Sequence, residues 1–255
     1  MKKIIAFVLA VAMIASVMVM SGCSEKKDKL TMATNAYFPP YEYYDGDKIV
    51  GIDAEVAQAI ANKLGMELEI VDIEFDSIIA GVQTGKYDMG MAGMTVTEER
   101  LQSVDFSTSY ATGIQSIIVP EDSKIQSIDD ILAKDAQYKV GVQLSTTGDL
   151  YISGDFETEG KSADLITQFQ TGNDAVAALS SGKVDCVIID NEPAKSYVAS
   201  TAGLKILDTE YVKEDYAICF SKNNTELKDK VDAALKELIA DGTVQKIVDK
   251  YITAE

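Results

Sequence analysis

A four-residue pattern, Gly-Lys-x-Asp, occurs twice in the chain, as residues 85–88 and 182–185. Apolar residues at helical spacing precede each copy, and a short apolar, strand-like run follows it. Counting five residues past each aspartate gives Gly93 in one copy and Asp190 in the other. The repetition favours two similar α/β units, although unrelated helix–turn–strand units also resemble one another.

The rest of the chain alternates in the same way. Apolar stretches of strand length and stretches with helical spacing follow one another, with short joints that often contain glycine. This alternation predicts an α/β fold whose sheets contain parallel strands. In open α/β sheets, ligands bind at the carboxyl ends of the strands. Gly93 and Asp190 are therefore candidate site residues.

Arg100 is the only arginine among 23 basic residues. A guanidinium group can bind a carboxylate through two parallel hydrogen bonds, which a lysine cannot do. Gly93 permits close approach to the backbone, and Thr95 offers a hydroxyl group. Thr97, followed by two glutamates, predicts the N-cap of a helix with Arg100 in its first turn. The stretch therefore predicts a carboxylate site, and the alternative is a surface arginine on a solvated helix.

Asp190 has the opposite charge and stands at the end of an apolar run, where it suits a cation. Phe38 and Phe75 each follow a predicted strand, so their rings could flank an apolar or cationic group. A carboxylate site that faces an acidic site matches the two charges of a free α-amino acid. Each residue alone is weak support, because an aromatic side chain near a strand end usually belongs to the core.

Composition excludes several classes of function. The chain has no histidine, which excludes Ser-His-Asp and Cys-His catalysis and any histidine-ligated metal site. We expect no cofactor and no metal. The net charge of −18 argues against nucleic acid and against electrostatic docking on anionic lipid. Cys186 and Cys219 lie in apolar runs, and we expect two separate buried thiols, although an exported pair could also form a disulfide.

The amino terminus predicts export. Two lysines precede an uncharged apolar run over residues 4–20, and Cys23 follows. This run falls just under the roughly 20 residues of a spanning helix, so a simple membrane anchor is the alternative. Residues 20–23 (Met-Ser-Gly-Cys) resemble the lipobox of a bacterial lipoprotein. The resemblance implies a signal peptide over residues 1–22, a lipid on Cys23 and a tether over residues 23–29.

Residues 30–251 resemble a family, the extracytoplasmic solute-binding proteins of polar amino-acid ABC transporters. The chain is most similar to the glutamine-binding and the lysine/arginine/ornithine/histidine-binding members. The matching segments are residues 37–41 (Tyr-Phe-Pro-Pro-Tyr), 50–53 (Val-Gly-Ile-Asp), 92–100 (Ala-Gly-Met-Thr-Val-Thr-Glu-Glu-Arg), 104–107 (Val-Asp-Phe-Ser), 140–143 (Val-Gly-Val-Gln) with Thr146, and 182–185 leading to Asp190.

The resemblance implies a two-lobed periplasmic-binding-protein fold of type II. Each lobe would be a mixed, mostly parallel sheet flanked by helices, and two strands would cross between the lobes. Lobe 1 would comprise residues 30–110 plus 216–255, and lobe 2 residues 114–212. We expect a monomer on the outer face of the cytoplasmic membrane, anchored by the lipid on Cys23 and working with the permease subunits of an ABC importer.

The same resemblance implies a role for each site residue. Arg100, Thr95 and Thr146 would hold the α-carboxylate of a free L-amino acid, and the Gly93 carbonyl and Asp190 would hold its α-ammonium. Two rings would sandwich its side chain, and two amides would contact its far end; these residues are Phe38, Phe75, Asn35 and Gln143.

The two amides favour a neutral polar ligand such as glutamine, with cystine and basic amino acids next. Asn35 stands where an aspartate is often found in the family, which removes a negative charge. Asp53 is expected to cap the following helix and therefore not to act as a pocket charge. The alternative function is an exported dehydratase of the same fold acting on prephenate or arogenate. It would need a general acid, for which Glu55 and Glu192 are the nearest glutamates.

Overall fold

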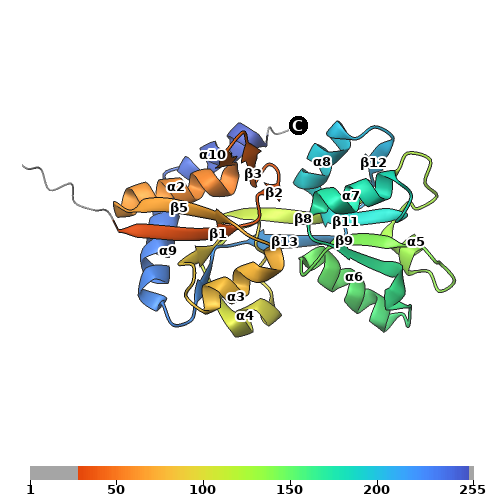
Figure 1. Ribbon diagram of the computed structural model, residues 1–255, viewed down its shortest axis with the longest axis horizontal. Helices are drawn as coiled ribbons and strands as arrows, with labels where there is room; N and C mark the ends of the chain where they lie inside the picture. The colour runs from red at the N-terminus through yellow and green to blue at the C-terminus, as the bar shows by residue number, and fades with distance from the viewer. Residues whose placement is uncertain (1–27, 253–255) are drawn as a thin grey trace, which may run out of the picture.

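The computed structural model describes residues 28–252 and contains two mixed sheets side by side, each flanked by helices (Figure 1). The first sheet has the strand order β5 (Glu67–Asp72), β1 (Lys29–Thr34), β6 (Met89–Gly90), β14 (Cys219–Ser221) and β7 (Val104–Phe106). The β1 strand pairs in parallel with β5 and β6, whereas β14 runs antiparallel to β6 and β7. The carboxyl ends of β1 and β6 therefore meet at one edge.

Helices cover both faces of this sheet. Those on one face pack against one another and are α2 (Ile52–Leu64), α9 (Thr225–Ala240) and α10 (Thr243–Tyr251). Those on the other are η1 (Phe75–Ser77), α3 (Ile78–Gln83) and α4 (Glu98–Ser103). Side chains of β1 alternate between the faces, since Met32 joins the cluster under α2 and Ala33 joins the cluster under α3.

The second sheet has the order β10 (Ile166–Phe169), β9 (Val140–Gln143), β11 (Cys186–Asp190), β8 (Ala111–Pro120) and β12 (Leu204–Ile206), with β13 (Val212–Tyr216) also paired to β8. The β9 strand is parallel to β10 and β11, and β8 is antiparallel to its neighbours. The remaining helical elements are α5 (Ile128–Leu132), α6 (Thr147–Thr158), η2 (Ala163–Leu165), α7 (Gly172–Ser180) and α8 (Asn191–Ser200).

Two strands, β8 and β13, run side by side between the sheets (Figure 1). This confirms the two-lobed fold with two crossing strands. The β13 strand is polar because Lys213 and Asp215 face solvent, while Glu214 and Tyr216 on its other side are buried. One buried residue in two is too weak an apolar signal to reveal a strand from sequence.

A small three-stranded sheet, formed by β2 (Tyr37–Phe38), β3 (Glu42–Asp45) and β4 (Lys48–Val50), follows β1. It leads into α2, whose N-cap is Gly51. The prediction that Asp53 caps this helix is wrong. Asp53 is fully buried, and its carboxylate accepts hydrogen bonds from the Gly93 N–H at 2.9 Å and the Tyr110 hydroxyl at 2.8 Å.

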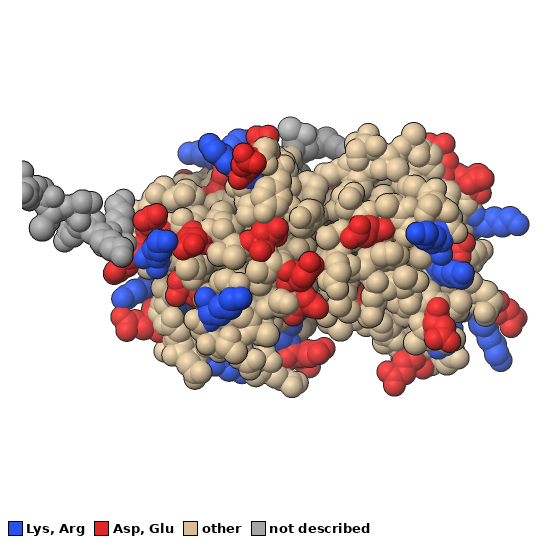
Figure 2. Space-filling view, in the orientation of Figure 1, with Lys and Arg blue, Asp and Glu red and all other residues tan. Residues whose placement is uncertain are grey.

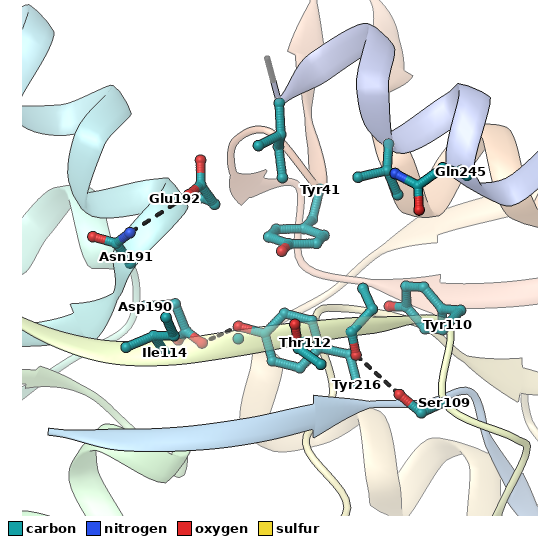
Figure 3. A pocket seen from close by; sticks show the side chains of 14 residues that line it. Tyr41, Ser109, Tyr110, Thr112, Ile114, Asp190, Asn191, Glu192, Tyr216 and Gln245 are labelled. Atoms are coloured by element: carbon teal, nitrogen blue, oxygen red, sulfur yellow. Dashed lines mark hydrogen bonds between the residues drawn. The ribbon is translucent and has the colours of Figure 1, made fainter. Parts of the chain in front are cut away.

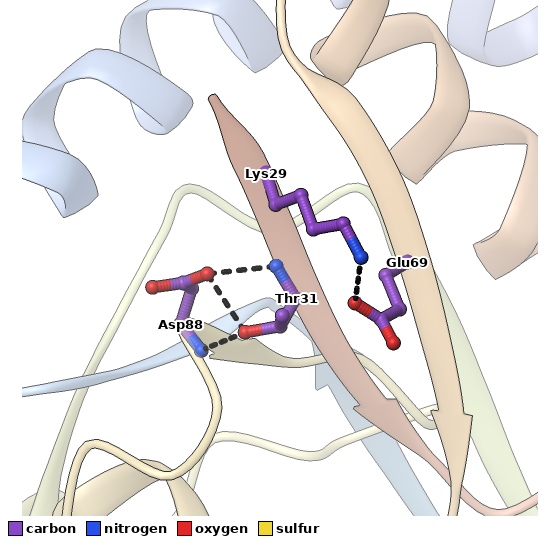
Figure 4. Close-up of polar contacts among 4 residues, drawn as sticks. All are labelled: Lys29, Thr31, Glu69 and Asp88. Carbon is purple, nitrogen blue, oxygen red and sulfur yellow. Dashed lines mark hydrogen bonds and ion pairs between the residues drawn. The ribbon is translucent and has the colours of Figure 1, made fainter. Parts of the chain in front are cut away.

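Asp88 of the first Gly-Lys-x-Asp copy ties β1 to the start of β6 (Figure 4). Its Oδ2 accepts hydrogen bonds from the backbone N–H and the hydroxyl of Thr31, both at 2.7 Å. The hydroxyl of Thr31 in turn accepts from the Asp88 N–H at 2.9 Å. Beside it, Lys29 and Glu69 form an exposed ion pair between β1 and β5. The hydrogen bonds between Asp88 and Thr31 keep β1 and β6 in register. Asn35 and Gly93 follow these two strands in the chain.

Cys186 and Cys219 are both buried, free thiols in different sheets. This confirms two separate buried thiols, with Cys186 in β11 and Cys219 in β14. Among residues 28–252, none of the helices combines the length and the apolar character that spanning a membrane requires. The predicted signal peptide, Cys23 and most of the tether lie outside the described residues.

Candidate functional site

All nine predicted ligand-binding residues line one cavity between the two sheets. They are Asn35, Phe38, Phe75, Gly93, Thr95, Arg100, Gln143, Thr146 and Asp190, and the cavity is also lined by Glu42 and Thr147. Its volume of about 10 Å³ is about the space of one water molecule. An amino acid therefore enters only if the lobes move apart, and the structure shows their closed arrangement.

Arg100 sits at the third position of α4, whose N-cap is Thr97, as the sequence predicted. Its Nη1 donates to the Thr95 carbonyl at 2.8 Å, and its Nη2 donates to the Ser145 carbonyl at 3.0 Å across the gap between the lobes. The guanidinium lies over the Phe75 ring at 5.5 Å, a favourable cation–π distance. Arg100 is therefore a buried residue, and the alternative of a solvated surface arginine is wrong.

Gly93 allows a close approach, and the group that approaches is a side chain of the protein. Its φ of 51° lies in the left-handed region, and a Cβ atom there would stand 2.9 Å from the Phe38 ring. The N–H of Gly93 is committed to Asp53, as described above. What Gly93 can still offer a ligand is its carbonyl oxygen.

Asp190 ends β11 and is buried opposite Arg100. Its carboxylate accepts hydrogen bonds from the Tyr216 hydroxyl and from Gln115 Nε2, the latter at 2.8 Å. Burial, followed by the nearby charge of Glu214, raises the pKa of Asp190 to about 7. An ammonium group that reached this carboxylate would restore its ionised form.

The amides of Asn35 and Gln143 meet across the cavity. Gln143 Nε2 donates to Asn35 Oδ1 at 2.9 Å and to the Gln170 carbonyl at 3.0 Å. The amide nitrogen of Asn35 donates to the Ile73 carbonyl at 2.9 Å. Both hydrogens of the Gln143 amide are thus committed within the protein, and its remaining capacity is as an acceptor.

Two threonines open α6 at the floor of the cavity. Thr146 is the N-cap, and its hydroxyl donates to the Gln143 carbonyl at 2.7 Å. Thr147 was missed by the sequence analysis. It is buried and hydrogen-bonded to Gln115 at 3.3 Å. The run of hydroxyl residues 145–147 indicated that hydroxyl groups lie at this helix start. It did not show that Thr147 is the one that contacts Gln115.

Glu42, also missed, is the first residue of β3 and is 1 % exposed. Its Oε2 has no hydrogen-bond partner within the described part of the chain. Burial and the nearby charges of Asp53 and Asp190 raise the pKa of Glu42 well above its ordinary value. The guanidinium of Arg100 is the only basic group among the residues that line the cavity, so Glu42 has no other cation in the cavity wall.

A wider groove of about 540 Å³ lies beside the crossing strand β8, between α10 and the start of α8 (Figure 3). It shares Asp190 with the cavity described above, and Tyr41 and Tyr216 form part of its wall. Glu192 faces this groove and pairs with Lys195. Glu55 is bonded to Lys250 on the surface. Neither glutamate lines the cavity that holds Arg100.

Acidic side chains flank the junction between the lobes on the face shown in Figure 2. The net charge of −18 gives this surface a negative potential that attracts cations. Within residues 28–252, no group of three or more histidine, cysteine or acidic side chains is arranged to hold a metal ion.

Comparison with known proteins agrees with this geometry. Residues 30–254 match the family described as bacterial extracellular solute-binding proteins, family 3. The arginine-binding extracellular protein ArtP of Bacillus subtilis is 37% identical over 243 residues, which cover 92% of this chain and 90% of ArtP.

Two solved structures are similar over nearly their whole length. The structure of an ancestral arginine-binding protein bound to glutamine has a TM-score of 0.81 at 38% identity and covers 89% of this chain and 99% of its own. The ancestral amino acid-binding protein AncCDT-1, a precursor of cyclohexadienyl dehydratase, has a TM-score of 0.78 at 32% identity and covers 88% and 95%. The chain belongs to the bacterial extracellular solute-binding proteins of family 3.

Proposed function

We propose that the protein captures one free L-amino acid between its two lobes and delivers it to an amino-acid ABC importer. The observation that carries this proposal is that Arg100 and Asp190, from different lobes, line the same cavity. A guanidinium and a carboxylate at opposite sides of a small buried space match the carboxylate and the ammonium of an α-amino acid. Family membership supports the same function.

The roles that the family resemblance implies fit this arrangement. Arg100 would exchange its bonds to the backbone carbonyls for the ligand's α-carboxylate, with Thr95 and Thr146 beside it. Asp190 and the Gly93 carbonyl would receive the α-ammonium. The side chain would pass between Phe38 and Phe75 toward Asn35 and Gln143, at the far end of the cavity.

The charge of the cavity lining favours a basic amino acid over the glutamine-like ligand that the sequence suggested. Glu42 adds a buried acid with an unpartnered oxygen, and Gln143 has only acceptor capacity left. A guanidinium supplies five donors and a positive charge, whereas glutamine supplies two donors and no charge. We therefore propose arginine first and glutamine second, and the name of ArtP, an arginine-binding protein, supports this order.

A dehydratase is the second candidate function. Neither Glu55 nor Glu192 lines the cavity, so both nominated acids are unsuitable. Glu42 provides a different one, because a carboxyl with a strongly raised pKa can serve as a general acid. We place this function behind amino-acid binding, because the relatives described above are named as binding proteins and AncCDT-1 is a precursor of the enzyme.

The organisation of the chain follows from the proposed role. Lobe 1 would comprise residues 30–110 plus 216–255 and lobe 2 residues 114–212. Residues 1–22 would be removed, and a lipid on Cys23 would tether a monomeric protein to the outer face of the cytoplasmic membrane. The permease subunits of the importer would then be its partners.

Titration calorimetry against the twenty amino acids tests the function. We expect one of them, with arginine first, to bind at micromolar or lower Kd with one site per chain. If none of the twenty amino acids binds and the protein converts prephenate or arogenate, the function is that of the dehydratase.

A further inference from the structure

A second buried carboxylate, Glu214, lies behind Asp190 and has no place in the ligand contacts proposed above. It stands on the crossing strand β13 and is 6 % exposed. Its Oε2 accepts a hydrogen bond from Gln115 Nε2 at 2.9 Å, and the same nitrogen donates to Asp190 Oδ2 at 2.8 Å. One amide group therefore bridges two buried carboxylates.

The surroundings of this pair leave a negative charge unbalanced. The Oε1 atom of Glu214 has no hydrogen-bond partner among the described residues. A buried carboxylate without a cation or a full set of donors is unfavourable. The titratable and charged groups that face the pair are Arg100 from α4, Tyr151 from α6, Tyr216 from β13, and Glu42 and Tyr41 from the β2–β3 hairpin. Arg100 is the single cation in this set.

We propose that Glu214 is a positioning residue for the ligand's α-ammonium group. Through Gln115 it fixes the orientation of the Asp190 carboxylate, and it adds a second negative charge behind that carboxylate. A bound amine would therefore supply the positive charge that the two carboxylates lack. This inference rests on the proposed function, because it concerns the same ligand.

A consequence is that binding depends on pH. The charge of Glu214 adds to burial in raising the pKa of Asp190 to about 7. Below that pH, Asp190 in the free protein carries a proton, which an incoming ammonium must displace. The affinity for an amine therefore falls as pH decreases below about 7, by up to about tenfold per pH unit for one proton. Glu214→Gln removes the neighbouring charge and lowers the pKa of Asp190, so the fall becomes shallower and moves to lower pH.

The wild-type protein alone supports a first test, with two ligands. L-Arginine and 5-guanidinopentanoic acid share a carboxylate and a guanidinium, but the second lacks the α-ammonium. Calorimetry between about pH 5.5 and 8 should show pH-dependent affinity for L-arginine, with a much shallower profile for 5-guanidinopentanoic acid. Parallel profiles for the two ligands would overturn the proposal.

Variants supply the second test, with L-arginine as the probe. Glu214→Gln should flatten the pH profile, and Glu214→Asp, which keeps the charge, should restore it. Glu210→Gln is the matched control, because Glu210 is exposed in the loop just before β13 and pairs with Lys213. If Glu214→Gln weakens binding by the same factor at every pH, Glu214 is merely structural and the inference fails. Failure of the wild type to bind any of the twenty amino acids would instead overturn the proposed function, and this inference with it.

Discussion

The two Gly-Lys-x-Asp units have nearly the same backbone framework but deliver different chemistry to the cavity. In each unit the N–H that follows the glycine donates to a carbonyl in the preceding helix, from Lys86 to Gly81 in one and from Lys183 to Ala178 in the other, both at 2.9 Å. Each aspartate then accepts a backbone N–H at 2.7 Å, from Thr31 in β1 in one unit and from Lys139, just before β9, in the other. The repetition suggested by the sequence is therefore present in the hydrogen bonds.

The units differ at the end of the strand that each one leads into. The first strand, β6, ends near Gly93, which contributes a carbonyl and no side chain, and Arg100 follows on a short helix. The second strand, β11, ends in Asp190 and contributes a carboxylate directly. A common framework thus places a cation on one side of the cavity and an anion on the other. The difference suggests that the framework sets position and that the residues beyond the strands set charge.

The largest expected effects come from the two charged residues. Asp190→Asn should weaken binding of the preferred amino acid by about 30-fold or more, or about 2 kcal/mol, because the ammonium loses a buried charged partner. Arg100→Lys should weaken it by about tenfold or more, because lysine keeps the charge but loses the paired donors. Calorimetry measures both, with the exposed Asp164→Asn as control. If either variant binds as tightly as the wild type, the substituted residue does not contact the ligand.

These two residues were predictable because each carries a chemical signal in the sequence itself. Arg100 is the single arginine of a lysine-rich chain, and Asp190 ends an apolar run. The Thr97 cap was visible as well, since capping depends on residues a few positions apart. The α/β class and the two lobes followed from alternation and from the family resemblance. Local patterns therefore gave much of the fold and six residues of the cavity wall, and the family resemblance added Asn35, Gln143 and Thr146.

The missed features depend on contacts between distant parts of the chain. Asp53 follows a glycine at a helix start and looks like a cap, yet it bonds to Gly93, 40 positions away. Glu42 lies among tyrosines and Glu214 in a polar segment, and nothing nearby in the sequence shows that packing buries these two acids. Because the charge inside the cavity depends on such buried acids, the ligand's charge could not be read from Asn35 and Gln143 alone.

The two aspartates of the repeated pattern should affect stability and spare binding. Asp88→Ala removes acceptors for two hydrogen bonds from Thr31 and should lower the free energy of unfolding by about 2 kcal/mol. Asp185→Ala removes one such bond, to the Lys139 N–H, and should lower it by about 1 kcal/mol. Urea denaturation gives both values. A change in ligand affinity larger than about twofold in either variant would mean that the framework also tunes the site.

Glu42 belongs to neither unit, and its removal should stabilise the protein without ligand. Its raised pKa means that the folded protein holds a proton that the unfolded chain releases near its ordinary value of 4.5. That stabilisation is present at low pH and is lost as pH rises through the folded-state pKa; Asp53, with its pKa raised to about 6, acts in the same direction.

Glu42→Gln should therefore raise stability at pH 8 by about 1 kcal/mol, or roughly 3 °C in Tm, and reduce the loss of stability between pH 5 and pH 8. The same variant should weaken arginine binding and leave glutamine binding nearly unchanged. Thermal unfolding and calorimetry test the two parts separately. If the ratio of the affinities for arginine and glutamine does not change, the preferred ligand is a neutral polar amino acid such as glutamine.

The smallest effect tests whether the two units are equivalent in their backbones. Gly85 and Gly182 have φ values of 75° and 69°, and a Cβ atom at either would meet no atom within 4 Å. Alanine at each position would therefore differ from glycine only through the left-handed backbone, at about 1 kcal/mol. Gly85→Ala and Gly182→Ala should lower the free energy of unfolding equally and leave affinity unchanged. Losses that differ by more than about 0.5 kcal/mol would show that the surrounding lobes, and not the repeated pattern, determine the conformation at these turns.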